Sequence, residues 1–98
     1  MAQFDVFRLG DGSLVLDCQS DLIDRYDTRL VVPLIAYAPD MVMMTRLHPR
    51  FSVAGEDVVM VTQFATSVRA RELRHRVGSL EQERLQIVGA IDVLIGTA

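Results

Sequence analysis

The sequence predicts a mainly β fold in which a curved antiparallel sheet, or small partial barrel, is covered by one C-terminal α-helix. Short runs of branched and aromatic residues alternate with turn residues over residues 3–62, which is typical of antiparallel strands. From Ser79 onward the apolar residues recur at helical spacing instead. The length allows one domain over residues 1–98, so sheet and helix must bury each other's apolar faces.

Two strands are expected at the start of the chain, over residues 3–9 and 13–18. They flank Gly10-Asp11-Gly12, whose glycines can adopt the positive φ values of a tight hairpin. Residues 29–35 are rich in β-branched side chains and predict a third strand. Pro33 cannot donate a ladder hydrogen bond, so we expect this strand at a sheet edge or with a bulge at the proline.

The middle of the chain predicts a second hairpin, with strands over residues 50–53 and 57–62 on either side of Gly55. Both faces of its second strand carry apolar side chains and are expected to be at least partly buried. Residues 36–46 fit either a short strand or a turn of helix, and residues 67–76 form a basic stretch before the helix.

The C-terminal helix is expected to run from Ser79, which can cap the first turn, with Gln82 three residues later as in a capping box. Gly89 on its apolar stripe predicts that another group packs closely there. Asp92 is the single polar residue in 90–95, so a partner surface is expected to cover this end. The expected buried face consists of Leu80, Ile87, Val88, Ile91, Leu94 and Ile95.

Composition excludes several classes of protein. A net charge of -3 argues against general nucleic-acid binding, which depends on clustered cations. Cys18 is the sole cysteine and lies in an apolar run, which predicts a buried, inert thiol in a reducing compartment. Neither a signal peptide nor an apolar run of membrane-spanning length is present, so we expect a cytoplasmic protein away from membranes. The small size favours a homodimer.

The sequence offers no evident catalytic set, cofactor motif or metal site. His48 and His75 are the two histidines, and neither has the spacing of a metal pair or a nucleophile signature. The acidic residues of 21–27 are interpreted as a polar turn. One basic strip has two readings, a solvated face or a docking surface for an acidic peptide, and it comprises Arg69, Arg71, Arg74 and Arg76.

An ordered set of short segments resembles the CcdB family of toxins from bacterial toxin–antitoxin modules. The resemblance rests first on Gln19-Ser20-Asp21-Leu22-Ile23-Asp24 and on Arg29-Leu30-Val31-Val32-Pro33-Leu34. It continues through Leu47-His48-Pro49, Gly55 and Met60-Val61-Thr62, and ends with the helix residues Leu80, Ile87, Ala90 and Ile91. No single segment is specific, but their order and spacing extend over nearly the whole chain.

The resemblance implies a homodimer that traps the cleaved DNA complex of DNA gyrase, through the gyrase A subunit, and is neutralised by a CcdA-like antitoxin. Residues implied in the gyrase contact are Leu22, Ile23, Asp92, Ile95, Gly96, Thr97 and Ala98. Asp92 stands where well-known members have an asparagine. Gly96-Thr97-Ala98 stand where those members end in Trp-Gly-Ile, so the usual aromatic anchor is replaced.

Three functions therefore remain open from the sequence. The first is a gyrase poison that uses other contacts in place of the tryptophan. The second is a protein of the same fold that binds an antitoxin but does not poison gyrase, or acts on another protein. The third is an RNA-cleaving toxin of the related interferase fold, for which no catalytic set can be matched residue by residue. Under the first two the protein is not an enzyme.

Overall fold

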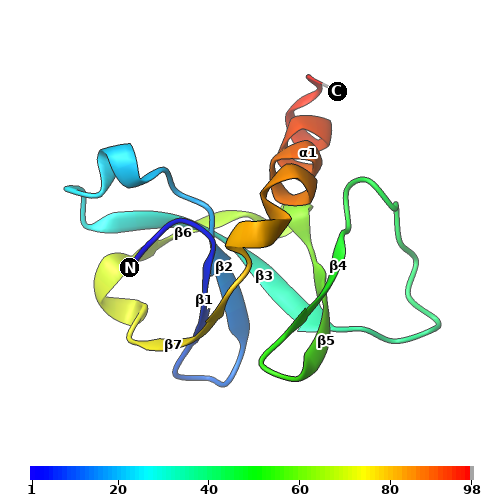
Figure 1. Cartoon of the computed structure of the whole chain (residues 1–98), viewed down its shortest axis with the longest axis horizontal. Helices are drawn as coiled ribbons and strands as arrows, with labels where there is room; N and C mark the ends of the chain where they lie inside the picture. The colour runs from blue at the N-terminus through cyan, green and yellow to red at the C-terminus, as the bar shows by residue number, and fades with distance from the viewer. Residues whose placement is uncertain (98) are drawn as a thin grey trace.

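Seven strands form one antiparallel sheet in the computed structural model, which describes residues 1–97 (Figure 1). The strand order is β4-β5-β3-β2-β1-β7, and β6 pairs with the first half of β3. The sheet curls into a half-barrel with one C-terminal helix, α1 (Arg84–Ile95), which confirms the predicted fold class. The strands are β1 (Asp5–Arg8), β2 (Leu14–Asp17), β3 (Thr28–Ala36), β4 (Arg50–Val53), β5 (Glu56–Met60), β6 (Thr66–Arg69) and β7 (His75–Ser79).

Both predicted hairpins are present, β1–β2 and β4–β5. The second turns through Ala54 (φ 53) and Gly55 (φ 77), the two positive φ values that a tight two-residue turn requires. Residues 37–49 form an irregular loop and adopt neither of the two expected structures. The basic stretch contains two strands that the sequence did not indicate, β6 and β7.

Pro33 lies in an interior strand, so the expectation of an edge or a bulge at this residue is wrong. It pairs in regular register with Val15 of β2. On the other side of β3, β6 pairs with residues 28–31 and β5 with residues 34–36. The Pro33 carbonyl accepts a hydrogen bond from Val61 N at 3.0 Å, so its nitrogen faces this same side. The missing N–H therefore falls between the two paired segments, where the ladder needs no donor.

The main core lies between the inner face of the curled sheet and α1. Ile87 and Ala90 are the fully buried residues of the helix, and both belong to this core. The sheet contributes Val6, Leu16, Val32, Val53, Val58 and Met60, among others, and Phe4 joins them from just before β1. A smaller cluster of Phe7, Val15, Val31 and Leu73 lies on the opposite face of the sheet.

The helix begins five residues later than predicted. Ser79 pairs with Asp5 at the end of β7, and its hydroxyl accepts from Glu81 N at 3.2 Å within a turn that leads to the short 3-10 helix η4 (Glu81–Glu83). Three residues of the expected buried face are exposed, namely Val88 (37%), Leu94 (40%) and Ile95 (65%). Leu94 and Ile95 are exposed because the last turns of α1 project beyond the sheet (Figure 1), whereas Val88 lies on the outer side of the helix.

Close packing occurs at a different glycine from the one expected. A Cβ added at Gly89 would have no neighbour within 4 Å, so the prediction of a close approach is wrong. At Gly78 in β7, the same atom would lie 2.8 Å from Cγ2 of Val53 in β4. The two end strands of the sheet thus approach each other where Gly78 leaves room.

We expect Gly78→Ala to lower the free energy of unfolding by about 1–3 kcal/mol, because the added methyl group overlaps buried Val53. The matched control is Gly89→Ala, which has open space and should raise stability by about 1 kcal/mol through helix propensity. Urea unfolding followed by circular dichroism measures both. Similar effects of the two substitutions would show that β4 and β7 do not approach closely.

Candidate partner-binding site

The loop between β2 and β3 presents the aliphatic pair that the resemblance implicates in partner binding. It contains the 3-10 helix η1 (Asp21–Ile23), which is preceded by Ser20, whose hydroxyl accepts from Leu22 N at 3.1 Å. The Leu22 side chain is 92% exposed and that of Ile23 is 45% exposed. Exposed aliphatic side chains of this kind add nothing to the core and are available to another protein.

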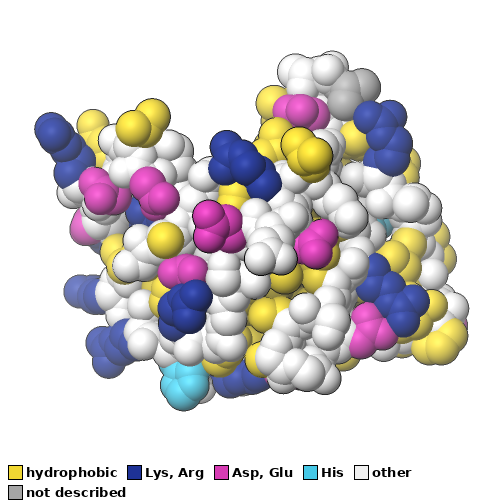
Figure 2. Space-filling view, in the orientation of Figure 1, with side chains coloured by type: hydrophobic (Ala, Val, Ile, Leu, Met, Phe, Trp, Pro, Cys, Tyr) yellow, Lys and Arg dark blue, Asp and Glu magenta, His cyan; other side chains and the backbone are white. Residues whose placement is uncertain are grey.

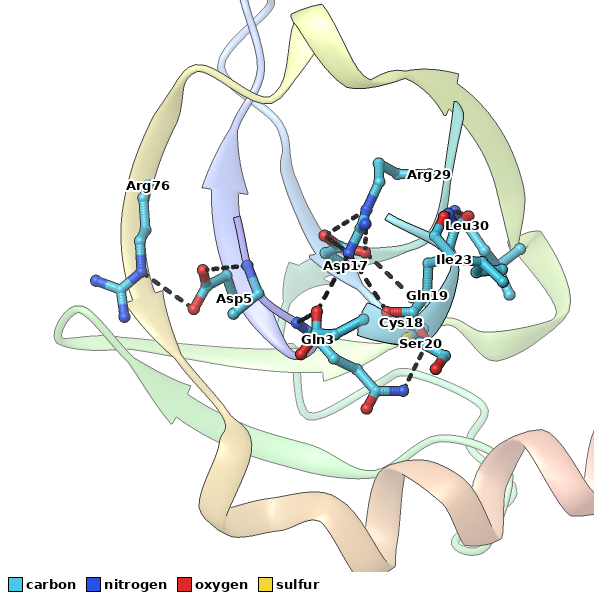
Figure 3. Close-up of polar contacts among 12 residues, drawn as sticks. Gln3, Asp5, Asp17, Cys18, Gln19, Ser20, Ile23, Arg29, Leu30 and Arg76 are labelled. Carbon is cyan, nitrogen blue, oxygen red and sulfur yellow. Dashed lines mark hydrogen bonds and ion pairs between the residues drawn. The ribbon is translucent and has the colours of Figure 1, made fainter. Parts of the chain in front are cut away.

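Gln19 lies beneath this loop and joins it to the sheet (Figure 3). Its Nε2 donates to the carbonyl oxygen of Ile23 at 3.1 Å, and its Oε1 accepts from the backbone N of Leu30 at 3.0 Å. At the start of the loop, Asp21 Oδ1 accepts from Gln3 N at 2.9 Å. Hydrogen bonds therefore hold both ends of η1.

A buried ion pair lies directly behind Gln19. The side chains of Asp17 in β2 and Arg29 in β3 are 0% and 1% exposed, and Arg29 Nη2 lies 2.8 Å from Asp17 Oδ2. Arg29 Nε donates to the same carboxylate at 2.9 Å. Asp17 also accepts from Gln19 N at 3.1 Å, and Arg29 donates to Gln19 O at 3.3 Å. The ion pair thus fixes the backbone of Gln19, and the side chain of Gln19 holds the β2–β3 loop.

Burial raises the pKa of two adjacent residues, Asp17 at the end of β2 and Cys18 directly after it. It raises the pKa of Asp17 above the ordinary 3.8, although hydrogen bonds from Arg29 and the backbone of Gln19 oppose the rise. Burial, together with the charge of Asp17, also raises the pKa of Cys18 from 9.0 to about 12. The Cys18 thiol is buried, as the sequence predicts, and stays protonated at neutral pH.

The end of α1 carries the other residues implicated by the resemblance. Asp92 is half-buried, and its carbonyl accepts from Thr97 N at 2.9 Å. Gly96 ends the helix in the left-handed conformation, with φ 82, which glycine adopts without strain. Ile95 and Thr97 are exposed, and Ala98 lies outside the described residues.

An apolar strip follows the outer side of α1, formed by Leu85, Val88 and Ile95. Leu94 lies on the other side, where it follows Ile87 and Ala90 at helical spacing. Leu85 is 89% exposed. Residues 85, 88, 92 and 95 are spaced three or four apart and so share one helix face, on which Asp92 is the polar member. Hydrophobic side chains are visible at the surface of α1 in Figure 2. The expectation that a partner covers this helix stays a prediction.

The Leu22–Ile23 loop and the end of α1 lie apart within one chain (Figure 1). Gln3 links the bases of the two elements. Its backbone N donates to Asp21 in the loop, and its Oε1 accepts from Arg84 Nη1 at the start of α1 at 3.0 Å. The implicated residues thus occupy two surfaces that share one polar connection.

The basic strip crosses β6, the 3-10 helix η3 (Ala70–Glu72) and β7, and its charges are partly neutralised. Arg69 pairs with Asp27 at 2.7 Å, and Arg76 pairs with Asp5 at 3.1 Å. Within residues 1–97, Arg71 and Arg74 have no ion pair, although Arg74 Nε donates to the Arg71 carbonyl. Two of the four predicted residues therefore keep free cationic groups.

Other possible sites are accounted for within the described part of the chain. His48 Nδ1 accepts from Met44 N at 3.0 Å and its Nε2 lies 2.8 Å from Gln63 Oε1, so the ring braces the 37–49 loop. Residues 1–97 contain no cluster of three His, Cys, Asp or Glu side chains that could hold a metal ion. In the same range, no helix has the length and apolar character needed to cross a membrane.

Sequence reasoning missed two features near these surfaces. One is the buried group of Asp17, Gln19 and Arg29, because the partners come from different strands and meet only through their register. The other is a hollow of about 240 Å³ under the 37–49 loop, lined by Ile35, Met41, Val42, Met43, His48, Val59, Val61 and Gln63. The apolar run of methionine and valine at residues 41–44 is the feature of the sequence that could have indicated this hollow.

Comparison with known proteins gives one family and one fold. A family model described as CcdB protein matches residues 3–96. None of the curated protein sequences matches the chain. Among solved structures, an "Endoribonuclease from Mycobacterial species" is similar, with a TM-score of 0.68 and 12% sequence identity over 98% of this chain and 91% of that one. At this identity the similarity shows a shared fold and not a shared activity.

We expect Arg29→Met to lower the free energy of unfolding by about 3–5 kcal/mol at neutral pH, because it leaves Asp17 buried without a counter-charge. Burial raises the pKa of Asp17 above 3.8 and Arg29 lowers it, so removing Arg29 raises the pKa further and makes the folded variant bind the proton more tightly than the folded wild type. The loss should therefore be smallest near pH 4 and grow as the pH rises through the raised pKa.

The control is the double variant Asp17→Asn/Arg29→Met, which contains neither charge. Urea unfolding at several pH values measures the free energy of unfolding of both variants relative to the wild type. This difference should change less with pH for the double variant than for Arg29→Met. A cost below about 1 kcal/mol for Arg29→Met at neutral pH would contradict the buried pair.

Proposed function

The chain belongs to the CcdB family of toxins, and from this premise we propose that it is the toxin of a type II toxin–antitoxin module that binds and poisons DNA gyrase. It acts by protein–protein contact in the cytoplasm and needs neither a cofactor nor a catalytic residue. The gyrase A subunit is its target.

The observation that carries the proposal is the exposed Leu22–Ile23 pair on a loop held by hydrogen bonds. The side chains point out of the fold while the backbone of η1 is fixed from beneath by Gln19. A fixed loop loses little conformational entropy on binding, and exposed aliphatic groups provide the apolar area that a partner buries.

The end of α1 provides the second part of the proposed contact. A homodimer related by a twofold axis brings two copies of α1 and two loops to one composite surface, which one chain alone does not assemble. Part of the apolar strip, with Leu94, then forms the dimer contact, while Ile95, Asp92 and residues 96–98 face gyrase. Ile95 replaces part of the apolar area that a terminal tryptophan supplies in the best-known members.

A CcdA-like antitoxin is the second proposed partner, and Arg71 and Arg74 are its proposed docking residues. Their guanidinium groups are free of intramolecular ion pairs within the described chain and can bind carboxylates of an acidic peptide. Arg69 and Arg76 contribute less because Asp27 and Asp5 already neutralise them.

Two alternatives have specific observations in their favour. Gly96-Thr97 stand where the best-known members of the family carry Trp-Gly, which favours a protein that binds an antitoxin without poisoning gyrase. The fold shared with an endoribonuclease raises RNA cleavage as the other alternative. Inducible expression, gyrase-dependent DNA cleavage and cleavage of a mixed RNA substrate, assayed together, separate the three.

We expect expression of the intact protein to kill bacteria and the purified protein to increase gyrase-cleaved DNA. Leu22→Ala/Ile23→Ala should weaken gyrase binding by about 30-fold, the effect of losing roughly 2 kcal/mol of buried contact. The matched control is Val42→Ala, which removes an aliphatic side chain that is 97% exposed on a different loop and should change nothing. Ile95→Ala tests the helix end in the same assay.

Healthy cells with uncut DNA would exclude the gyrase proposal, and antitoxin binding without toxicity would then support the second function. Degraded RNA with unaffected gyrase would support the third.

We expect Arg71→Ala/Arg74→Ala to weaken binding of the module's antitoxin about tenfold at low salt and by less at high salt, because screening reduces the attraction between exposed charges. Isothermal titration at two salt concentrations measures this. Arg69→Ala/Arg76→Ala is the control with the same change in charge and should have a smaller effect. Equal affinities for both variants and the wild type would refute a docking role for the strip.

A further inference from the structure

We propose that Gln19 is a positioning residue, which holds the Leu22–Ile23 loop in the conformation that binds the partner. This inference rests on the proposed function for its consequence in binding, while its structural part can be tested on the protein alone. Gln19 is 9% exposed, so its own side chain offers almost nothing to a partner.

The loop needs such a residue because it has no apolar anchor. None of the residues of η1 is buried, and residues 21–27 are all exposed. Its position therefore depends on hydrogen bonds and ion pairs. Gln3 N and Ser20 Oγ hold the first part through Asp21 and Leu22.

Gln19 holds the second part and closes the loop. Its amide spans the gap between Ile23, the last residue of η1, and Leu30, which already belongs to β3 (Figure 3). The NH₂ group donates to one and the carbonyl oxygen accepts from the other, so both functions of the amide are used. Removing the amide frees Ile23 O and residues 24–26, whereas Asp27 stays joined to the sheet through Arg69 and Ala70 N.

The Asp17–Arg29 pair makes Gln19 a rigid support. Asp17 accepts from the Gln19 backbone N, and Arg29 donates to its backbone O, so both backbone groups are fixed by buried charged partners. Hydrogen bonds to charged groups are stronger than those between neutral groups. The Gln19 side chain therefore ties the end of η1 to a fully buried ion pair.

The test is Gln19→Met, which keeps the length of the side chain and removes both hydrogen-bonding groups. Amide hydrogen exchange at Leu30, whose N–H loses its acceptor, should accelerate about fivefold to tenfold, the effect of losing roughly one net hydrogen bond. Exchange at residues 23–27 should also accelerate as the loop loosens, while exchange in β1 and β2 stays unchanged. Gln63→Met is the control, since Gln63 is an exposed glutamine that contacts His48 and lies outside the loop. Unchanged exchange at residues 23–27 in Gln19→Met would overturn the proposal.

A double-mutant cycle then tests the consequence for binding. Gln19→Met should weaken binding to gyrase about fivefold in the wild-type background and much less in Leu22→Ala/Ile23→Ala, because a loop without its contact residues gains nothing from being positioned. Equal losses in both backgrounds would indicate a general structural role and refute positioning. If the wild type does not bind gyrase, the proposed function fails, and the exchange measurement still decides whether Gln19 orders the loop.

Discussion

The buried pair of Asp17 and Arg29 is the interaction on which both the sheet and the loop surface depend. Two charges are removed from water at one end of the β2–β3 ladder, which is costly unless each finds its partner in good geometry. Here the carboxylate and guanidinium satisfy each other and the backbone of Gln19 as well. A wrong register between β2 and β3 would separate the charges, so the pair favours a single alignment of these strands.

The same arrangement explains how a small domain presents apolar side chains without burying them. Apolar groups usually order a segment by packing into the core, which would remove Leu22 and Ile23 from reach. This chain orders the segment with polar contacts from beneath and leaves the aliphatic groups outside. The helix α1 is instead held by apolar packing, since Ile87 and Ala90 are buried in the core while its last turns extend past the sheet.

Local signals in the sequence predicted the parts of the fold that local chemistry determines. Gly12 and Gly55 marked the two hairpins, and β-branched runs marked β2, β3 and β5. The strands β6 and β7 lacked such signals because few of their side chains are buried and they are held by backbone pairing to β3 and β1. Gly78 and Gly89 could not be told apart, since a close approach depends on which strand curls back onto the residue.

The sequence predicted the exposed residues of the candidate site but not the buried residues that hold its loop in place. Leu22 and Ile23 were found through an ordered family pattern, whereas Asp17, Gln19 and Arg29 looked like ordinary strand residues. Their contacts join positions 10 to 12 residues apart in the chain and exist only once two strands are aligned.

Pro33 has a further consequence for the alignment of the strands that pair with β3. It marks the one point of β3 at which pairing passes from β6 to β5 on the same side. If either strand slid along β3 while the chain folded, a backbone acceptor would face the ring nitrogen of the proline and find no hydrogen. The proline thus disfavours a shifted register of β5 or β6 on β3, and it costs the native sheet no hydrogen bond.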